Sequence, residues 1–261
     1  MVLGESRRLA IAELLRSAGS VSVAELETKF GVSSMTARRD LAALERQGIA
    51  RRTHGGAVLP GVAAHEDSFA QRVERDSVAK RALAEEAIKL LAPRQTVFFD
   101  SSSTAYYVAQ RVVDERLALS VITNSLPIME LVGRAELPGL ELIAIGGTFR
   151  KLTHSFVGPV AIQAVLGHFA DRLFLSVKGV SSGGVLTDAD PLEAEVKRAM
   201  IAHAEESVLL LDSSKLSTRG LSAICPVGEL STVLTHGIPP DRLGHLRADG
   251  VAVRLVDREA S

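Results

Sequence analysis

The chain has 261 residues, a formal net charge of −1 and 46% hydrophobic residues, which predicts one large domain or two smaller ones with a sizeable core. It holds no apolar run of membrane-spanning length, and its charged, amphipathic N-terminus lacks the apolar block of a signal peptide, so we expect no membrane association and a cytoplasmic location. Cys225 is the only cysteine, which excludes an intrachain disulfide, and we expect neither a metal nor a cofactor.

Positive charge is concentrated at the N-terminal end. Residues 1–58 hold nine Lys or Arg and six Asp or Glu, whereas the remaining residues hold 21 and 25. A small basic head on a mildly acidic body fits a nucleic-acid contact that is confined to one end of the chain.

Three helical patterns fill the first 50 residues. The first covers residues 5–18. The second begins at Ser22, with a glutamate three positions later as in a capping box, and ends at Gly31. The third begins at Ser33 or Ser34 and ends before the next glycine of the sequence.

A strand, a glycine turn and a second strand are predicted over residues 49–58. Helices followed by such a hairpin are the order of a winged helix-turn-helix. We therefore expect a DNA-binding domain over residues 1–58. A linker over residues 59–75 follows, which includes the start of a connecting helix.

The third helix has a core stripe and a polar face. Ala37, Leu41 and Leu44 lie within about 60° of one another on a helical wheel, and Asp40 lies near them, so we expect Asp40 to orient an arginine or cap a neighbouring element. The polar face suits DNA, because N-terminal N–H groups favour phosphate and arginine pairs with guanine or phosphate. An arginine pair alone is more often a solvated face, but the basic hairpin favours DNA. The predicted DNA-binding residues are Ser33, Ser34, Met35, Thr36, Arg38, Arg39, Arg51, Arg52 and His54.

Beyond residue 75 the sequence alternates between helical stretches and apolar runs. A helix is predicted over 76–91. The apolar runs are nearly continuous, as in parallel strands that are buried on both faces. They lie at residues 96–99, 119–123, 140–145, 172–177, 207–211 and 251–256. We expect a doubly wound, mostly parallel α/β domain over residues 76–261.

Polar turns follow several of these strands, at the sheet edge where open α/β sheets bind ligands. Residues 101–104 place four hydroxyl side chains at a helix N-terminus, which suits a phosphate, although a simple N-cap needs only one of them. Thr123-Asn124 and Gly146-Gly147 end the next two strands, and Asp212-Ser213-Ser214-Lys215 adds a cation. Together these turns favour a cleft lined with hydroxyls, amides and a lysine.

The head contains the motifs Phe-Gly-Val-Ser, Thr-x-Arg-Arg-Asp-Leu, Leu-Glu-x-x-Gly and His-Gly-Gly-Ala in register. On these motifs the chain resembles the DeoR family of bacterial transcription regulators, from about residue 5 to residue 256. In the body, the family's Asp-Ser-Gly-Thr-Thr turn corresponds to residues 100–104, with Ser102 in place of glycine. The resemblance implies that the recognition helix faces DNA through Ser34, Thr36, Arg38 and Arg39.

The resemblance also implies a body similar to ribose-5-phosphate isomerase that senses a phosphorylated sugar. We therefore expect a regulator, most often a repressor of a carbohydrate operon in this family, that binds double-stranded operator DNA. Reading two half-sites requires at least a homodimer. The expected effector-binding residues are Asp100, Ser101, Ser102, Ser103, Thr104, Thr123, Asn124, Gly146, Gly147, Lys178, Glu193, Lys197 and Lys215.

The alternative is a sugar-phosphate isomerase that carries a DNA-binding head. Isomerisation needs a carboxylate base, for which Asp100, Glu193 and Glu195 are candidates. Glu193 and Lys197 are also an i,i+4 pair, typical of an exposed charged helix. For these residues we favour a role in orienting the ligand, or a place on an exposed helix, over a catalytic role, because a sensor must bind its signal without consuming it. RNA binding is disfavoured, because no aromatic stacking platform is visible.

Overall fold

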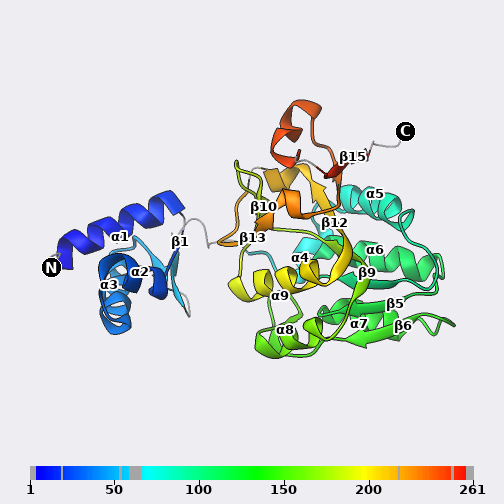
Figure 1. Cartoon of the computed structure of the whole chain (residues 1–261), viewed down its shortest axis with the longest axis horizontal. Helices are drawn as coiled ribbons and strands as arrows, with labels where there is room; N and C mark the ends of the chain where they lie inside the picture. Colours follow the sequence, from blue (N-terminus) through cyan, green and yellow to red (C-terminus); the bar gives the residue numbers. More distant parts are fainter. Residues whose placement is uncertain are drawn as a thin grey trace. The chain divides into compact units, whose positions relative to one another are not determined.

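A computed structural model describes residues 4–18, 20–52, 55–58, 66–216, 218–247 and 250–256. The chain divides into two compact units, residues 1–66 and residues 67–261. Both are drawn in Figure 1. Among the described residues, none of the helices combines the length and the apolar character that crossing a membrane requires.

The first unit is a small helical domain with a three-stranded antiparallel sheet in the order β1-β3-β2. Its elements are α1 (Gly4–Ala18), β1 (Ser20–Ser22), α2 (Val23–Phe30), α3 (Ser34–Arg46), β2 (Arg51–Arg52) and β3 (Gly56–Val58). The three predicted helices and the hairpin are all present. The short strand β1 was not predicted, and it pairs with β3 of the hairpin.

Local capping chemistry sets the helix ends in this unit. Ser22 Oγ accepts a bond from Glu25 N at 3.1 Å, and Ser22 N donates to Glu25 Oε2 at 2.7 Å, so the predicted capping box is confirmed. Gly31 ends α2 with φ +61°, in the left-handed region that favours glycine. Of the two candidate caps of α3, Ser33 is the N-cap.

Asp40 orients an arginine of another helix, as predicted. Arg7 Nε on α1 donates to Asp40 Oδ2 at 2.6 Å, and both side chains are almost fully buried. The bond joins α1 to α3 beside the core stripe, where Ala37, Leu41 and Leu44 are buried. The α3 residues around this stripe are thereby held in a fixed orientation.

The second unit alternates strands and helices over most of its length. Its helices are α4 (Phe69–Glu74), α5 (Ser77–Ile88), α6 (Ser103–Asp114), α7 (Leu126–Gly133), α8 (Pro159–Leu166) and α9 (Pro191–Ala202). Short 3-10 helices lie at Ser213–Leu216, Val227–Glu229 and Pro240–Leu246. The main-sheet strands are β4 (Thr96–Phe99), β5 (Ser120–Thr123), β6 (Glu141–Ala144), β9 (Ala170–Leu175), β12 (Ala204–Asp212), β14 (Thr232–His236) and β15 (Ala252–Val256). The other strands are β7 (Thr148–Arg150), β8 (Ser155–Val157), β10 (Gly179–Val180), β11 (Val185–Asp188) and β13 (Ser222–Pro226).

The main sheet has seven parallel strands in the order β15-β14-β12-β9-β4-β5-β6. The six predicted apolar runs are strands of this sheet. The seventh strand, β14, was missed. Helices cover both faces: Val97 and Phe99 of β4 pack with α5, α6 and α7, whereas Phe98 packs with α8 and α9. The predicted doubly wound α/β fold is confirmed.

The second unit begins earlier than the predicted residue 76, because helix α4 belongs to it. Phe69 of α4 meets Tyr106 of α6 edge to face, with ring centroids 5.6 Å apart. Tyr107 donates from its hydroxyl to Val73 O at 3.1 Å. The segment that follows the first unit in the chain is therefore fixed to the N-terminal half of α6.

The topological switch point of the sheet lies between β4 and β9. From β4 the chain adds β5 and β6 on one side, and it then returns to place β9, β12, β14 and β15 on the other. In open α/β sheets, ligands bind at the carboxyl ends of the strands at this point. The residues that follow β4 and β9 are Asp100 and Ser176, and the polar cluster of the second unit is built around them.

Candidate functional site

The N-terminal half of α3 presents its polar face to solvent. Ser33, Ser34, Met35, Arg38 and Arg39 are exposed, and Thr36 is half-buried. Ser33 also caps the helix through its Oγ, which accepts from Thr36 N at 3.4 Å. These residues form the surface on which the sequence predicted DNA contacts.

The hairpin supplies one further exposed arginine. Arg52 is exposed, and its backbone N donates to Glu45 Oε1 of α3 at 2.8 Å, which joins the hairpin to the recognition helix. Arg51 lies on β2, but its side chain lies outside the described part of the chain. His54 also lies outside the described residues.

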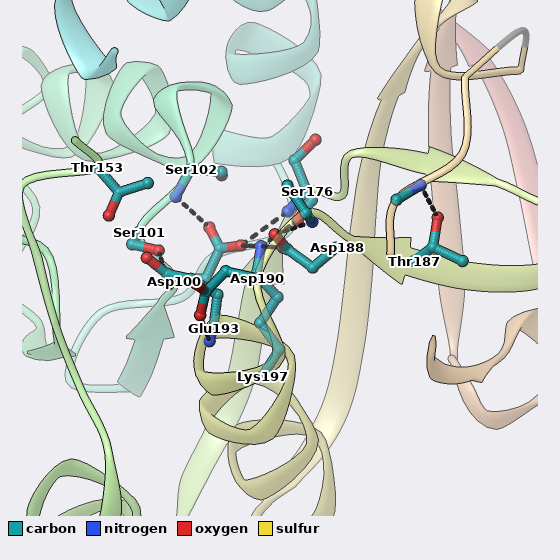
Figure 2. A network of polar contacts seen from close by, with 12 residues as sticks. Asp100, Ser101, Ser102, Thr153, Ser176, Thr187, Asp188, Asp190, Glu193 and Lys197 are labelled. Carbon is teal, nitrogen blue, oxygen red and sulfur yellow. Dashed lines mark hydrogen bonds and ion pairs between the residues drawn. The ribbon is translucent and has the colours of Figure 1, made fainter. Parts of the chain in front are cut away.

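In the second unit, Asp100 and Lys197 form a buried ion pair at the switch point. Lys197 Nζ donates to Asp100 Oδ2 at 2.8 Å and to Ser176 O at 2.6 Å, and it lies 3.0 Å from Asp188 Oδ2. Figure 2 shows these side chains pointing toward one another. Burial alone would lower the pKa of Lys197, but Asp100 and Asp188 raise it above its ordinary value.

Asp100 also accepts bonds from two backbone donors. Ser102 N donates to its Oδ1 at 3.0 Å, and Ser176 N donates to its Oδ2 at 3.1 Å. Asp100 and Lys197 therefore join the turns after β4 and β9 to helix α9. Their main part is to shape the site, since their contacts are with other residues of the protein.

Glu193 belongs to the same cluster. Its Oε2 accepts from Ser101 Oγ at 2.8 Å and its Oε1 accepts from Ser155 Oγ at 2.5 Å. Burial raises the pKa of Glu193, and the nearby Asp188 raises it further. The sequence also allowed Glu193 and Lys197 to be an i,i+4 pair on an exposed, charged helix. That alternative is wrong, because both side chains are buried.

The four hydroxyl residues at the start of α6 differ in their contacts: the side chains of the first two make hydrogen bonds within the protein, and those of the last two do not. Ser101 binds Glu193, and Ser102 Oγ caps the helix by accepting from Ala105 N at 3.1 Å. Ser103 Oγ and Thr104 Oγ1 have no hydrogen-bond partner among the described residues. Their backbone N–H groups occupy the first turn of α6, where a helix offers N–H donors without an internal acceptor. This second pair is free to receive an anion.

Four cations of the second unit lie close enough together to act on one another electrostatically. Burial lowers the pKa of Lys80 to about 8, with Lys215 contributing, while Asp212 and Asp76 oppose the shift. Burial also lowers the pKa of Lys215, as do Lys178 and Arg72, again against Asp212 and Asp76. The cluster consists of Arg72, Lys80, Lys178 and Lys215.

Two of these cations have nitrogen atoms that make no direct hydrogen bond or ion pair within the described residues. Within the described residues, no hydrogen bond or ion pair engages Lys215 Nζ, and the Nε and Nη2 of Arg72 are buried without an acceptor. The Arg72 guanidinium lies 5.8 Å from the centroid of Phe69, which contacts Tyr106 in the first turns of α6. Buried donors without an acceptor are costly, so the Arg72 nitrogens favour an anionic ligand beside them.

The remaining predicted residues have mainly structural contacts. Thr123 Oγ1 donates to Phe99 O at 2.8 Å, and Asn124 Nδ2 donates to Phe156 O at 2.9 Å, while Asn124 Oδ1 is buried without a partner. Gly146 and Gly147 are exposed. Gly147 has φ +151°, and a Cβ there would lie 2.8 Å from Val157 O, which explains the glycine by packing.

Sequence reasoning missed several members of the site. Asp188 ends an antiparallel strand that gives no continuous apolar run, so its position beside Lys197 was not visible. Arg150 binds Asp190 at 3.3 Å and lies 3.9 Å from Glu193. Arg72 reaches the site only because α4 folds onto α6. The missed residues are Arg72, Lys80, Arg150, Ser155, Ser176, Asp188 and Asp190.

Two domain families match the sequence. The DeoR-like helix-turn-helix domain matches residues 7–61, and the DeoR C terminal sensor domain matches residues 75–237. The HTH-type transcriptional regulator GlpR of Haloferax volcanii is 32% identical over 97% of this chain and 98% of its own length. Transcriptional repressor AccR of Agrobacterium fabrum is 32% identical over 88% and 89%, and the lactose phosphotransferase system repressor of Staphylococcus epidermidis is 31% identical over 86% and 89%.

One solved structure similar to part of the chain is ribose 5-phosphate isomerase A of Methanocaldococcus jannaschii. It is 19% identical, covers 54% of this chain and 55% of its own, and has a TM-score of 0.39. A likeness at this level carries no functional argument.

Proposed function

The chain belongs to the DeoR family of transcription regulators, and we propose that it represses a carbohydrate operon until a phosphorylated sugar binds its second unit. The first unit would bind the operator through α3 and the hairpin. The observation that carries the proposal is that the unit has both hydrogen-bond donors without an acceptor at the start of α6 and cationic nitrogens of Arg72 and Lys215 without a direct hydrogen bond or ion pair. A cytoplasmic dimer is part of the proposal, since two heads are needed to read an operator with two half-sites.

The site has two chemically distinct sides, which fits a phosphorylated sugar. A phosphoryl dianion would bind the N–H and hydroxyl groups of Ser103 and Thr104, with Arg72 and Lys215 supplying charge. The carboxylates of Asp188 and Glu193 would accept bonds from sugar hydroxyls. Asn124 Oδ1, buried without a partner, adds a further acceptor close to β5.

We discard the isomerase alternative. The relatives that match most of the chain are named as transcription regulators or repressors. The contacts of the candidate bases agree with this. Asp100 accepts bonds from Lys197 and from two backbone N–H groups, and Glu193 accepts bonds from two serine hydroxyls. Glu195 is exposed and is not one of the buried residues of the cluster.

The proposal is tested by measuring operator affinity of the full chain with a panel of phosphorylated sugars and their unphosphorylated forms. We expect at least one phosphorylated sugar to weaken operator binding and its unphosphorylated form to have no effect. A response to the free sugar alone would contradict the assignment of the phosphate.

Arg38→Ala is expected to weaken operator binding by about 1–3 kcal/mol and to relax specificity at one base pair, if Arg38 reads a base. If Arg38 contacts only phosphate, the affinity for all DNA sequences will fall by the same factor. The slope of log affinity against log salt concentration will then decrease in magnitude by about one. The control is Arg134→Ala, which removes an exposed arginine directly after α7 of the other unit. Unchanged affinity and salt slope in both Arg38→Ala and Arg39→Ala would rule out this recognition surface.

Effector binding is expected to take up protons near pH 8. The pKa of Lys80 is about 8 and that of Lys215 is lowered, and an adjacent dianion will raise both. A sugar phosphate has already lost its second proton, whose pKa is about 6, so it releases none. The affinity for the effector should therefore fall as the pH rises from about 7 to 9. Calorimetry at pH 8 in two buffers with different ionisation enthalpies measures the uptake, and proton release would contradict it.

A further inference from the structure

Helix α8 has no charge on its exposed face. Its solvent-facing side chains span about 120° at 100° per residue. They are Pro159, Val160, Gln163, Leu166 and Gly167, and Phe169 follows directly. The exposed faces of the other long helices carry charges, such as Arg81 on α5, Asp114 on α6 and Glu195 on α9. An uncharged outer face is therefore particular to α8 among these helices.

Exposed apolar side chains gather around this helix. In the described part of the second unit, eight large apolar side chains are exposed, and six of them lie between residues 149 and 192. The six are on or beside α8, on the β7–β8 hairpin and in the first turn of α9, and these elements pack against one another. Figure 1 shows α8 beside α9. Single exposed apolar residues are ordinary, but such a concentration marks an interaction surface.

Phe169 is the most exposed of these side chains, at 77%, and its ring is held in place. It stacks on His203 with centroids 4.8 Å apart and an interplanar angle of 20°. An aromatic ring that is already oriented loses little conformational freedom when a partner covers it. Aromatic residues are also enriched in the cores of protein–protein interfaces.

We propose that the α8 face, defined by Val160, Leu166 and Phe169, is the surface through which two copies of this chain associate. This inference rests on the proposed operator binding, which needs two heads. In a twofold interface a surface packs against itself, so an uncharged apolar face is complementary to its own copy, whereas a charged face would repel it. A nucleic-acid partner would need basic residues, which this face lacks.

The test compares Val160→Glu with Val78→Glu in the full chain. Val160 is 68% exposed on α8, and Val78 is 67% exposed on α5, so both substitutions place the same charge at an equally exposed valine. We expect sedimentation to give the parent a mass that is a multiple of 27.7 kDa, Val160→Glu half of that mass, and Val78→Glu the parent's mass. Phe169→Glu should reproduce the Val160→Glu result, and thermal melting checks that each variant folds.

A monomeric parent, or a Val160→Glu and a Phe169→Glu that both keep the parent's mass, overturns the proposal. Operator binding on the same samples separates this failure from that of the proposed function. If Val160→Glu halves the mass, its operator affinity should fall on the order of 100-fold through lost bivalency. If the parent binds no operator but Val160→Glu still halves the mass, the proposed operator binding is refuted and the proposed association surface is supported.

Discussion

Ser103→Asp will abolish the response to phosphorylated sugars and leave operator binding intact. The carboxylate will occupy the first turn of α6, where the helix N-terminus stabilises an anion by about 0.3–1 kcal/mol, so the unit should fold. It will repel the phosphoryl group that the proposal places there. Loss of two bonds to a charged group, at about 1.5–3 kcal/mol each, corresponds to a fall in effector affinity of more than about 100-fold.

Ser103→Asn is the matched control, because asparagine has the size of aspartate without its charge. It should keep effector affinity within about tenfold of the parent's. The measurement is operator affinity of each protein with and without the active sugar phosphate. If the Ser103→Asp variant still releases the operator in response to effector, the phosphoryl group binds elsewhere.

Lys197→Met will destabilise the second unit by about 3–5 kcal/mol. The substitution removes the cation that Asp100 and Asp188 share, and it leaves both carboxylates buried without that partner. In a unit of this size the melting temperature should fall on the order of 10 °C. The first unit has its own core, so its transition should be unchanged.

Lys151→Met controls for the lost charge, since Lys151 is an exposed lysine that makes no hydrogen bond or ion pair within the described residues. Surface substitutions of this kind change stability by about 0.5 kcal/mol or less. Thermal unfolding followed by calorimetry compares the two variants. Equal shifts in both would show that the buried ion pair contributes little to the stability of the unit.

Sequence chemistry predicted the features of the fold that depend on neighbouring residues. Ser22 and Gly31 set helix ends through their own side chain or backbone freedom, and both ends were predicted. Six parallel strands were visible because strands buried on both faces are nearly continuously apolar. β14 was not, because its sequence Thr-Val-Leu-Thr-His has only two apolar residues and is polar at both ends, although the whole strand is buried.

The candidate site was predicted in outline but not in its internal division of roles. Asp100 and Lys197 were both named, and the structure joins them although they are 97 residues apart in the chain. No local pattern shows that Ser101 and Ser102 bind within the protein while Ser103 and Thr104 do not. The position of Arg72 likewise depends on the packing of α4 against α6, which amphipathic periodicity in a six-residue helix cannot reveal.

The attachment of α4 to α6 sets the number of residues that connect the DNA-binding unit to the second unit. Ten residues lie between the end of β3 at Val58 and the start of α4 at Phe69. Fully extended, they reach at most about 33–36 Å. One turn of B-DNA separates adjacent half-sites by about 34–36 Å. The anchored tether therefore limits how far apart a pair of operator half-sites can be spaced, and release of α4 would lengthen that reach by several residues.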